Sequence, residues 1–376
     1  MGETNRVEAE TFVGLDVHRK SVVATAFDPQ GRQLSQARLG ATDRELIEYL
    51  QALPGTKRVA LEACPVWEHF FDAAESTGAS VSLSNPLKTR LIAEASLKTD
   101  RVDSEALATL LRLDALPTSY APPPETRDLR ARIRERVFYR RKAGAVMQRI
   151  YPALLRRGIE YEDGLLQHRR KREVLRDLHL PEVDRGLDAL RYLEDLCKDL
   201  DRDIESTCDD SPEAQLLRTI PGVGPLTAMA VVAFLCPIDR FASVEKLSSY
   251  VGLCPTTHQS GDTIRYGSLK RDSNGLVRWL LVEAAWRHRR RVPRGAVARV
   301  ANRVGRRRGK QQGTVAGTHT LLKIIYAMLK HREAFRPQAP GPSTSVRIGR
   351  RLPTTARTCV RRTVLELPTA NSPSAS

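Results

Sequence analysis

Several features are scarce in this 376-residue sequence. The longest apolar run, Leu226 to Ile238, is shorter than the ~20 residues needed to span a bilayer, so no membrane span is expected. The segment MGETNRVEAE lacks the basic start and apolar core of a signal peptide. The six cysteines show no CxxC spacing, which argues against a structural zinc site and a disulfide framework. We therefore expect a cytoplasmic protein with reduced thiols.

Acidic residues are scarce in the C-terminal part. Residues 216–376 carry 28 basic and 7 acidic side chains, a net charge of +21, whereas residues 1–120 have a net charge of −4 and residues 121–215 are neutral. Such a basic region indicates a polyanionic partner, most simply nucleic acid. Arginine outnumbers lysine 49 to 12. Both phosphate recognition by guanidinium groups and GC-rich coding remain open as explanations.

The N-terminal third predicts a ribonuclease H-like α/β domain. Three short apolar runs are followed by alternating helical and strand-like segments, in the order βββ-α-β-α-β-α. Thr42-x-x-Glu45 is a capping box that predicts a helix start. The expected strands are Phe12–Val17, Val22–Phe27, Gln33–Leu39, Arg58–Ala63 and Ala79–Leu83, and the expected helices are 42–53, Val66–Thr77 and Arg101–Leu113.

Further domain boundaries follow from composition. The proline-rich linker Pro117–Pro124 separates residues 1–118 from two long polar helices, expected at about 125–155 and 183–205, which predict a helical coiled-coil arm over residues 119–215. Between Arg127 and Arg149 this arm has nine basic and two acidic residues, so a phosphate-facing stripe and a solvated helix face both remain open. Residues 216–336 form a mainly helical third domain, and residues 337–376 a disordered tail.

Four carboxylates are placed to bind metal. Asp16 lies in the first strand and Glu62 ends the fourth, while Asp100 and Asp103 begin the last helix of the first domain. In a ribonuclease H sheet the first and fourth strands are parallel neighbours, so Asp16 and Glu62 would lie side by side with that helix over them. Four hard oxygen donors suit two Mg²⁺ ions acting on a phosphodiester, with Mn²⁺ as a substitute. The alternative is that they are ordinary surface acids at strand ends and helix caps.

The turn Pro221-Gly-Val-Gly224 lies between two helical segments and is similar to a helix-hairpin-helix motif. Gly222 and Gly224 would let backbone N–H groups at a helix N-terminus approach a DNA phosphate without reading bases. A plain tight turn between helices is the alternative.

Ser260 lies in a stretch that we expect to be a polar loop leading into a basic segment. Its hydroxyl is a candidate nucleophile for phosphate chemistry, although a serine in a loop more often has a structural role. His258 is a candidate base or an exposed loop histidine. Four nearby cations are expected to bind phosphate: Arg265, Lys270, Arg271 and Arg278.

Six segments occur in the order found in one known family: GLDVHRK, ALEAC, KTDRVDSEAL, IPGVG, the RF…L..Y.GL.P…QSG block and the R-x-x-L-x-x-AA helix. Together they resemble the DEDD transposases of the insertion-sequence family numbered one hundred and ten. These bridge-RNA-guided recombinases include site-specific DNA invertases. The resemblance covers residues 12 to about 336. One departure is Ser273-Asn274, where the family usually has Gly-Asn, since glycine could supply a positive φ there.

The resemblance implies roles for individual residues. Asp16, Glu62, Asp100 and Asp103 match the four acidic metal ligands, and Ser260 matches the serine that forms a covalent link to DNA. The arm would mediate dimerisation, with two dimers assembling to a tetramer in which the serine of one protomer completes the acidic site of another. A structured RNA would select donor and target DNA.

Two other functions stay open at this point. A Holliday-junction resolvase-like nuclease would use the four carboxylates and water, and would leave Ser260 idle. A decayed mobile element would leave an inactive protein that still binds nucleic acid.

Overall fold

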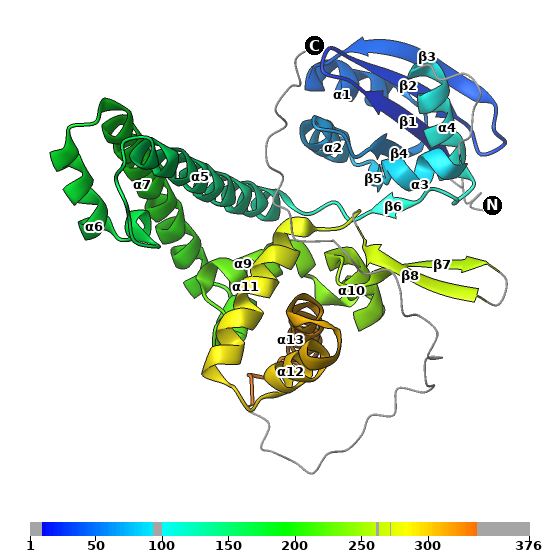
Figure 1. Cartoon of the computed structure of the whole chain (residues 1–376). Helices are drawn as coiled ribbons and strands as arrows, with labels where there is room; N and C mark the ends of the chain where they lie inside the picture. Colours follow the sequence, from blue (N-terminus) through cyan, green and yellow to red (C-terminus); the bar gives the residue numbers. More distant parts are fainter. Residues whose placement is uncertain (1–9, 93–99, 261–262, 271, 337–376) are drawn as a thin grey trace, which may run out of the picture. The chain divides into compact units, whose positions relative to one another are not determined.

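The computed structural model describes residues 10–92, 100–260, 263–270 and 272–336, apart from the side chains at 91, 100, 101 and 257–266 (Figure 1). The chain divides into two compact units, Met1–Pro123 and Pro124–Ser376. The division lies within the predicted proline-rich linker. The predicted disordered tail lies outside the described residues. No helix in the described ranges is long and apolar enough to cross a membrane.

The first unit is built on a six-stranded mixed sheet with the order β3-β2-β1-β4-β5-β6. Strands β1, β2 and β3 form an antiparallel meander, and β4 pairs parallel with both β1 and β5. The predicted parallel neighbourhood of the first and fourth strands is therefore confirmed. The strands are β1 (Glu10–Val17), β2 (Ser21–Phe27), β3 (Gln33–Gly40), β4 (Thr56–Glu62), β5 (Ser80–Ser84) and β6 (Thr118–Ser119).

Helices cover both faces of this sheet. Val13, Leu15 and Val17 of β1 join the apolar core with the helices α1 and α2, while Phe12 joins a second cluster with Leu107 of α4. The period of two along β1 thus assigns alternate residues to opposite faces. The helices are α1 (Asp43–Ala52), α2 (Trp67–Ser76), α3 (Pro86–Ile92) and α4 (Asp100–Arg112); α3 and β6 were not predicted from the sequence.

The predicted helix start at Thr42 is confirmed, with the Thr42 half of the capping box formed and Glu45 bonded to the N–H of Gly40 in place of that of Thr42. Thr42 Oγ1 accepts a hydrogen bond from the Glu45 backbone N–H, and Glu45 Oε2 accepts one from Gly40 N–H at 2.7 Å. The first bond satisfies a donor that helix formation would otherwise leave unpaired, whereas the second ties Glu45 to the end of β3.

The second unit begins with two long helices, α5 (Pro124–Leu155) and α7 (Pro181–Asp209), joined by η1 (Leu165–Gln167), α6 (Arg169–Glu173) and η2 (Val174–Leu178). The two helices pack antiparallel, since Arg136 early in α5 pairs with Asp201 late in α7, and Arg156 pairs with Glu182. Apolar residues such as Ile150 and Leu187 fill their interface. The helical hairpin is thus observed, whereas coiled-coil geometry and dimerisation stay predictions.

The rest of the second unit is mainly helical. Most residues of α9 are buried in its core. Helix α11 packs against α9, and α13 packs against α11 in the same core. The elements are α8 (Pro212–Arg218), α9 (Pro225–Leu235), η3 (Ile238–Arg240), α10 (Val244–Val251), β7 (Pro255–Ser260), β8 (Thr263–Leu269), α11 (Gly275–Arg291), α12 (Ala296–Arg308) and α13 (Lys310–His331). The hairpin β7–β8 corrects the prediction that Ser260 lies in a loop. Polar residues dominate β7, so no apolar alternation indicates a strand there.

Candidate active site

Asp16 is an acid buried near the carboxyl end of an apolar strand. It is 8% exposed, and its backbone pairs with Val23 of β2. His18, two residues further along, donates from Nε2 to Asp16 Oδ2 at 2.9 Å while keeping half of its own side chain exposed. Burial of an ionised carboxylate requires hydrogen bonds or a cation. Its burial and its bond to His18 make Asp16 a candidate ligand for a cation at the carboxyl ends of the strands.

Glu62 lies beside Asp16. The parallel register of β1 and β4 runs as far as Leu15 opposite Leu61, so Asp16 and Glu62 occupy the next positions on the two strands. Ala60, two residues before Glu62, packs in the same cluster as Phe12 and α4. Because strand side chains alternate between faces, Glu62 and Asp16 belong to the α4 face of the sheet.

The helix α4 approaches this face very closely at Gly14. A Cβ at Gly14 would lie 2.0 Å from the carbonyl oxygen of Ser104 and 2.5 Å from Ala108 N. The buried hydroxyls of Ser104 and Thr25 also lie 2.9 Å apart, which ties α4 to β2. Asp103, half-buried, is therefore carried on the first turns of a helix pressed against the strand that bears Asp16. Asp100 is the first residue of the same helix, and its side chain is not among those that the structure describes.

The Cys64 thiol reports the combined charge of the two strand acids. It donates to the backbone oxygen of Val17 at 3.7 Å. Burial raises the pKa of Cys64 above its ordinary value, and the negative charges of Glu62 and Asp16 raise it further. Both carboxylates therefore lie near one thiol at the carboxyl ends of β1 and β4.

The donor chemistry of this edge suits a hard divalent cation, because Asp16, Glu62 and Asp103 offer carboxylate oxygens. Among the described side chains, which exclude that of Asp100, no three His, Cys, Asp or Glu residues are grouped closely enough to hold a metal ion. The sheet places Asp16 and Glu62 at neighbouring strand positions, and α4 carries Asp103 on the same face without closing a group of three described side chains. Closure of the four into one metal site stays a prediction.

Ser260 is the last residue of β7, and its backbone pairs with Thr263 at the start of β8. This position puts it at the turn end of the hairpin. At the other end, Lys270 N donates to Cys254 O at 3.2 Å, just after α10 and just before α11. The structure does not describe the side chains of Ser260, His258 and Arg265, and Arg271 lies outside the described residues. Lys270 is half-buried at the hairpin base.

Arg278 braces that base. Its Nη1 donates to the backbone oxygens of Gly252 at 3.1 Å and Lys270 at 3.2 Å, and to Ser273 Oγ at 3.3 Å. The sequence predicts a phosphate ligand here, whereas these contacts give Arg278 a structural role within its own fold. Ser273 is not among the described residues with positive φ, and its hydroxyl donates to Lys270 O. Serine is thus accommodated where the family usually has glycine.

The two glycines of the IPGVG turn differ in surroundings. Gly222 has φ +102°, and a Cβ there would lie 2.6 Å from the backbone nitrogen of His288 in α11. His288 Nδ1 bonds to Pro221 O at 2.8 Å, so this side of the turn is packed against the fold. A Cβ at Gly224 would meet no atom within 4 Å, and Gly224 is the N-cap of α9. The Cβ side of the turn is therefore open at Gly224 and packed at Gly222; phosphate binding by these glycines stays a prediction.

Comparison with known families agrees with this arrangement. The family model of the IS110-type DEDD transposases matches residues 13–156, and the model described as the transposase IS116/IS110/IS902 family matches residues 214–301. The chain belongs to the IS110 family of DEDD transposases. The enzyme therefore acts on DNA, which it cuts and rejoins. Membership in a DEDD family also indicates dependence on a divalent metal.

Curated relatives of this IS110-family transposase match most of its length. It is 24% identical to the transposase for insertion sequence element IS1111A of Coxiella burnetii, over 86% of this chain and 91% of that protein. It is 25% identical to the transposase for insertion sequence element IS1328 of Yersinia enterocolitica, over 73% and 83% respectively. Among solved structures it resembles T. thermophilus RuvC in complex with Holliday junction substrate, at 12% identity and a TM-score of 0.24, over 29% of this chain and 99% of that chain. That score is too low to bear on the fold.

We call the carboxyl ends of β1 and β4, together with the start of α4, the acidic edge. Reasoning from sequence missed two of its residues. His18 was recognised only as part of the GLDVHRK segment, although its place two residues after Asp16 at the end of a strand is a usable signal. Gly14 gives a weaker signal, because a glycine within a strand often marks close approach of another backbone. Its role depends on α4, which is distant in sequence.

Proposed function

We propose that this transposase cuts and rejoins DNA through Ser260, with Asp16, Glu62, Asp100 and Asp103 holding Mg²⁺. The observation that carries the proposal is that Asp16 and Glu62 occupy neighbouring positions near the carboxyl ends of β1 and β4, on the α4 face of the sheet. The order β3-β2-β1-β4-β5 with a parallel β1–β4 pair supports a ribonuclease H-like domain, in which this sheet edge holds the metal site.

The acidic edge has one chemical task. A bound divalent cation would polarise a phosphodiester and neutralise charge that develops on its oxygens. Asp16, Glu62, Asp100 and Asp103 would hold that cation, with Mn²⁺ as a substitute for Mg²⁺. His18 would orient Asp16 through the bond to Oδ2, so that the other carboxylate oxygen faces the neighbouring strand end.

Ser260 would supply the nucleophile. Its Oγ attacks the phosphorus of the scissile phosphodiester, a serine–phosphate ester forms, and the P–O bond to one DNA strand breaks. The departing DNA oxygen takes up a proton as the serine loses its own, so no bond energy is lost to water. A DNA hydroxyl then attacks the phosphorus of the phosphoserine. A phosphodiester forms again and the serine hydroxyl is released, so strands are rejoined without a nucleoside triphosphate.

The rest of the chain would bind nucleic acid and assemble the enzyme. The net charge of +21 over residues 216–336 and the tail supports binding to a structured guide RNA and to donor and target DNA. We assign residues 1–118 to the acidic domain, 119–215 to an arm for dimerisation, and 216–336 to the serine domain. A tetramer of two dimers would let the Ser260 of one protomer serve the acidic site of another.

The serine assignment is tested by Ser260→Ala. Labelled DNA is incubated with protein, Mg²⁺ and RNA transcribed from the flank of the element, then separated on a denaturing gel. A slow, protease-sensitive DNA species should form with the wild type and be absent with Ser260→Ala, while DNA binding is retained. Ser268→Ala, an exposed serine on the same hairpin, should behave as the wild type. Cleavage by Ser260→Ala, or only free ends with the wild type, would instead identify water as the nucleophile.

A further inference from the structure

The C-terminal half of α11 and all of α12 form a strongly basic surface. From Trp286 to Lys310 the chain has eleven basic residues and no acidic one, and no acidic residue occurs anywhere from Ala284 to Arg332. All eleven are exposed except Arg289, which is half-buried. We call this the arginine surface. It is separate from the individual phosphate-binding residues named from the sequence, which lie between positions 222 and 278, and from the Arg127–Arg149 stretch of the arm.

The positive charges of the arginine surface repel one another, and no ion pair within the described ranges offsets this repulsion. Arg299, Arg303 and Arg307 are spaced at i, i+4 along α12, where like charges destabilise a helix. None of the eleven forms an ion pair with any residue in the described ranges. The opposite side of α12 packs on α13 through small residues, since a Cβ at Gly313 would lie 2.5 Å from Ala301 O. The charged side of α12 therefore faces solvent, as expected of a surface that binds a polyanion.

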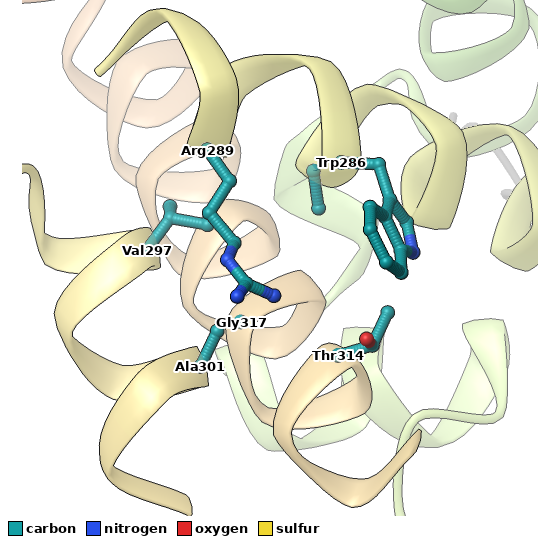
Figure 2. Close-up of a pocket in the computed structure, with 7 residues that line it drawn as sticks. Trp286, Arg289, Val297, Ala301, Thr314 and Gly317 are labelled. Carbon is teal, nitrogen blue, oxygen red and sulfur yellow. The ribbon is translucent and has the colours of Figure 1, made fainter. Parts of the chain in front are cut away.

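An aromatic ring lies within this surface. Trp286 is 44% exposed, and the Arg289 guanidinium lies 5.7 Å from its ring centroid. Arg289 Nη2 also donates to Asn302 Oδ1 of α12 at 2.8 Å, which holds the guanidinium between two helices. In Figure 2 both side chains project from α11 beside a small pocket whose other lining includes Ala301 of α12 and Gly317 of α13. The pocket is much smaller than a nucleobase, so the ring itself offers the contact.

We propose that the arginine surface binds single-stranded nucleic acid, with an unpaired base stacked on Trp286 and phosphates bound by the arginines around it. A π-face beside clustered guanidinium groups is the arrangement that binds unpaired strands without reading their sequence. A duplex would use the cations and leave the ring idle, because its bases are already stacked. The inference rests on the proposed function only in that the enzyme handles nucleic acid.

The first experiment measures the stacking. Fluorescence anisotropy of full-length protein is recorded in EDTA with labelled single-stranded DNA, the matching RNA strand and the matching DNA duplex. Trp286→Ala should weaken single-strand binding by about 5- to 150-fold and leave duplex binding unchanged. Trp286→Phe should restore much of the loss and, as one of three tryptophans is removed, abolish most of the fluorescence quenching on binding. The DNA and RNA arms identify which strand is preferred.

The second experiment measures the charge. Arg303→Gln with Arg307→Gln should reduce the salt slope of single-strand binding by roughly 1.4, at ~0.7 per lost contact. The thermal stability of this double variant should stay equal or rise, because the repulsion along α12 falls. Arg185→Gln with Arg191→Gln on α7 removes the same charge from exposed positions elsewhere and should leave the slope unchanged.

The outcomes separate this proposal from the proposed function. Equal losses for single strand and duplex in Trp286→Ala, or no loss for either, would overturn the stacking inference whatever Ser260 does. An unchanged salt slope in the α12 variant would overturn the arginine surface. Since neither measurement needs metal or strand cleavage, a failure of the Ser260 chemistry would leave both results readable.

Discussion

Gly14 in β1 lies directly beneath Ser104 in α4, so closely that a Cβ on Gly14 would come within 2.0 Å of the Ser104 carbonyl oxygen. This contact sets how near the α4 acids come to Asp16, which is two residues further along the same face of β1. The acidic edge therefore depends on a residue that carries no functional group.

Gly14→Ala should force α4 away from the sheet. Overpacking of this kind lowers the free energy of unfolding by about 1–3 kcal/mol, and it should also reduce the thermal stabilisation by Mg²⁺. Gly144→Ala in α5 is the matched control: its Cβ would meet no atom within 4 Å, and the change should stabilise by about 0.5–1 kcal/mol. Urea denaturation measures both. Equal stability of Gly14→Ala and the wild type would show that α4 is not held at this contact.

Asp16→Asn should abolish recombination and blunt the rise in melting temperature that Mg²⁺ produces. Clustered carboxylates repel one another, and a cation that binds only the folded state stabilises it by mass action. Without Mg²⁺ the variant should melt no lower than the wild type, because one negative charge has gone from the pair with Glu62. Glu75→Gln, an exposed acid on α2, serves as the control. Recombination at the wild-type rate by Asp16→Asn would refute the metal assignment.

Arg278→Ala should loosen the base of the Ser260 hairpin. The change removes the donor to the oxygens of Gly252 and Lys270, a loss of about 1–3 kcal/mol. Proteolysis within residues 254–270 should become faster, and strand cleavage should fall while the salt slope of DNA binding stays the same. Arg278→Lys should not rescue, since a single ammonium cannot reproduce the guanidinium contacts. A reduced salt slope with unchanged proteolysis would instead support the phosphate role predicted from the sequence.

The stability of the second unit should fall as pH drops below 6.5. Burial lowers the pKa of His288 below 6.5, although its hydrogen bond to Pro221 O opposes this in part. Burial also lowers the pKa of His319, with Lys323 adding to the effect. Below 6.5 the unfolded chain takes up protons that the folded unit does not, so the free energy of unfolding falls with pH until the folded histidines are protonated as well.

His288→Gln should flatten that dependence, while His331→Gln, at an exposed position, should not. Melting temperatures taken above and below pH 6.5 provide the measurement. A pH profile in which His288→Gln follows the wild type would mean that His288 titrates alike in both states.

Much of the first unit could be predicted from local pattern. The apolar runs around Asp16 and Glu62 define strands that are parallel neighbours in a ribonuclease H sheet, as β1 and β4 are here, and the side-chain period of two then determines which face the acids share. The two long arm helices follow equally from charge and periodicity. These predictions succeeded because the signal and the structure it specifies lie within a few residues of each other.

Tertiary structure decided what depends on distant partners. Strand β7, which carries Ser260, has no apolar alternation, and the base of its hairpin is held by hydrogen bonds from Arg278 to the backbone of Gly252 and Lys270. Arg278 turned inward for the same reason, although its sequence neighbours are cations that suggest a phosphate site. Composition determined that this protein binds a polyanion. The tertiary structure decides the surroundings of each arginine, because packing brings the carbonyls of Gly252 and Lys270 to Nη1 of Arg278 and leaves the arginines of α12 exposed.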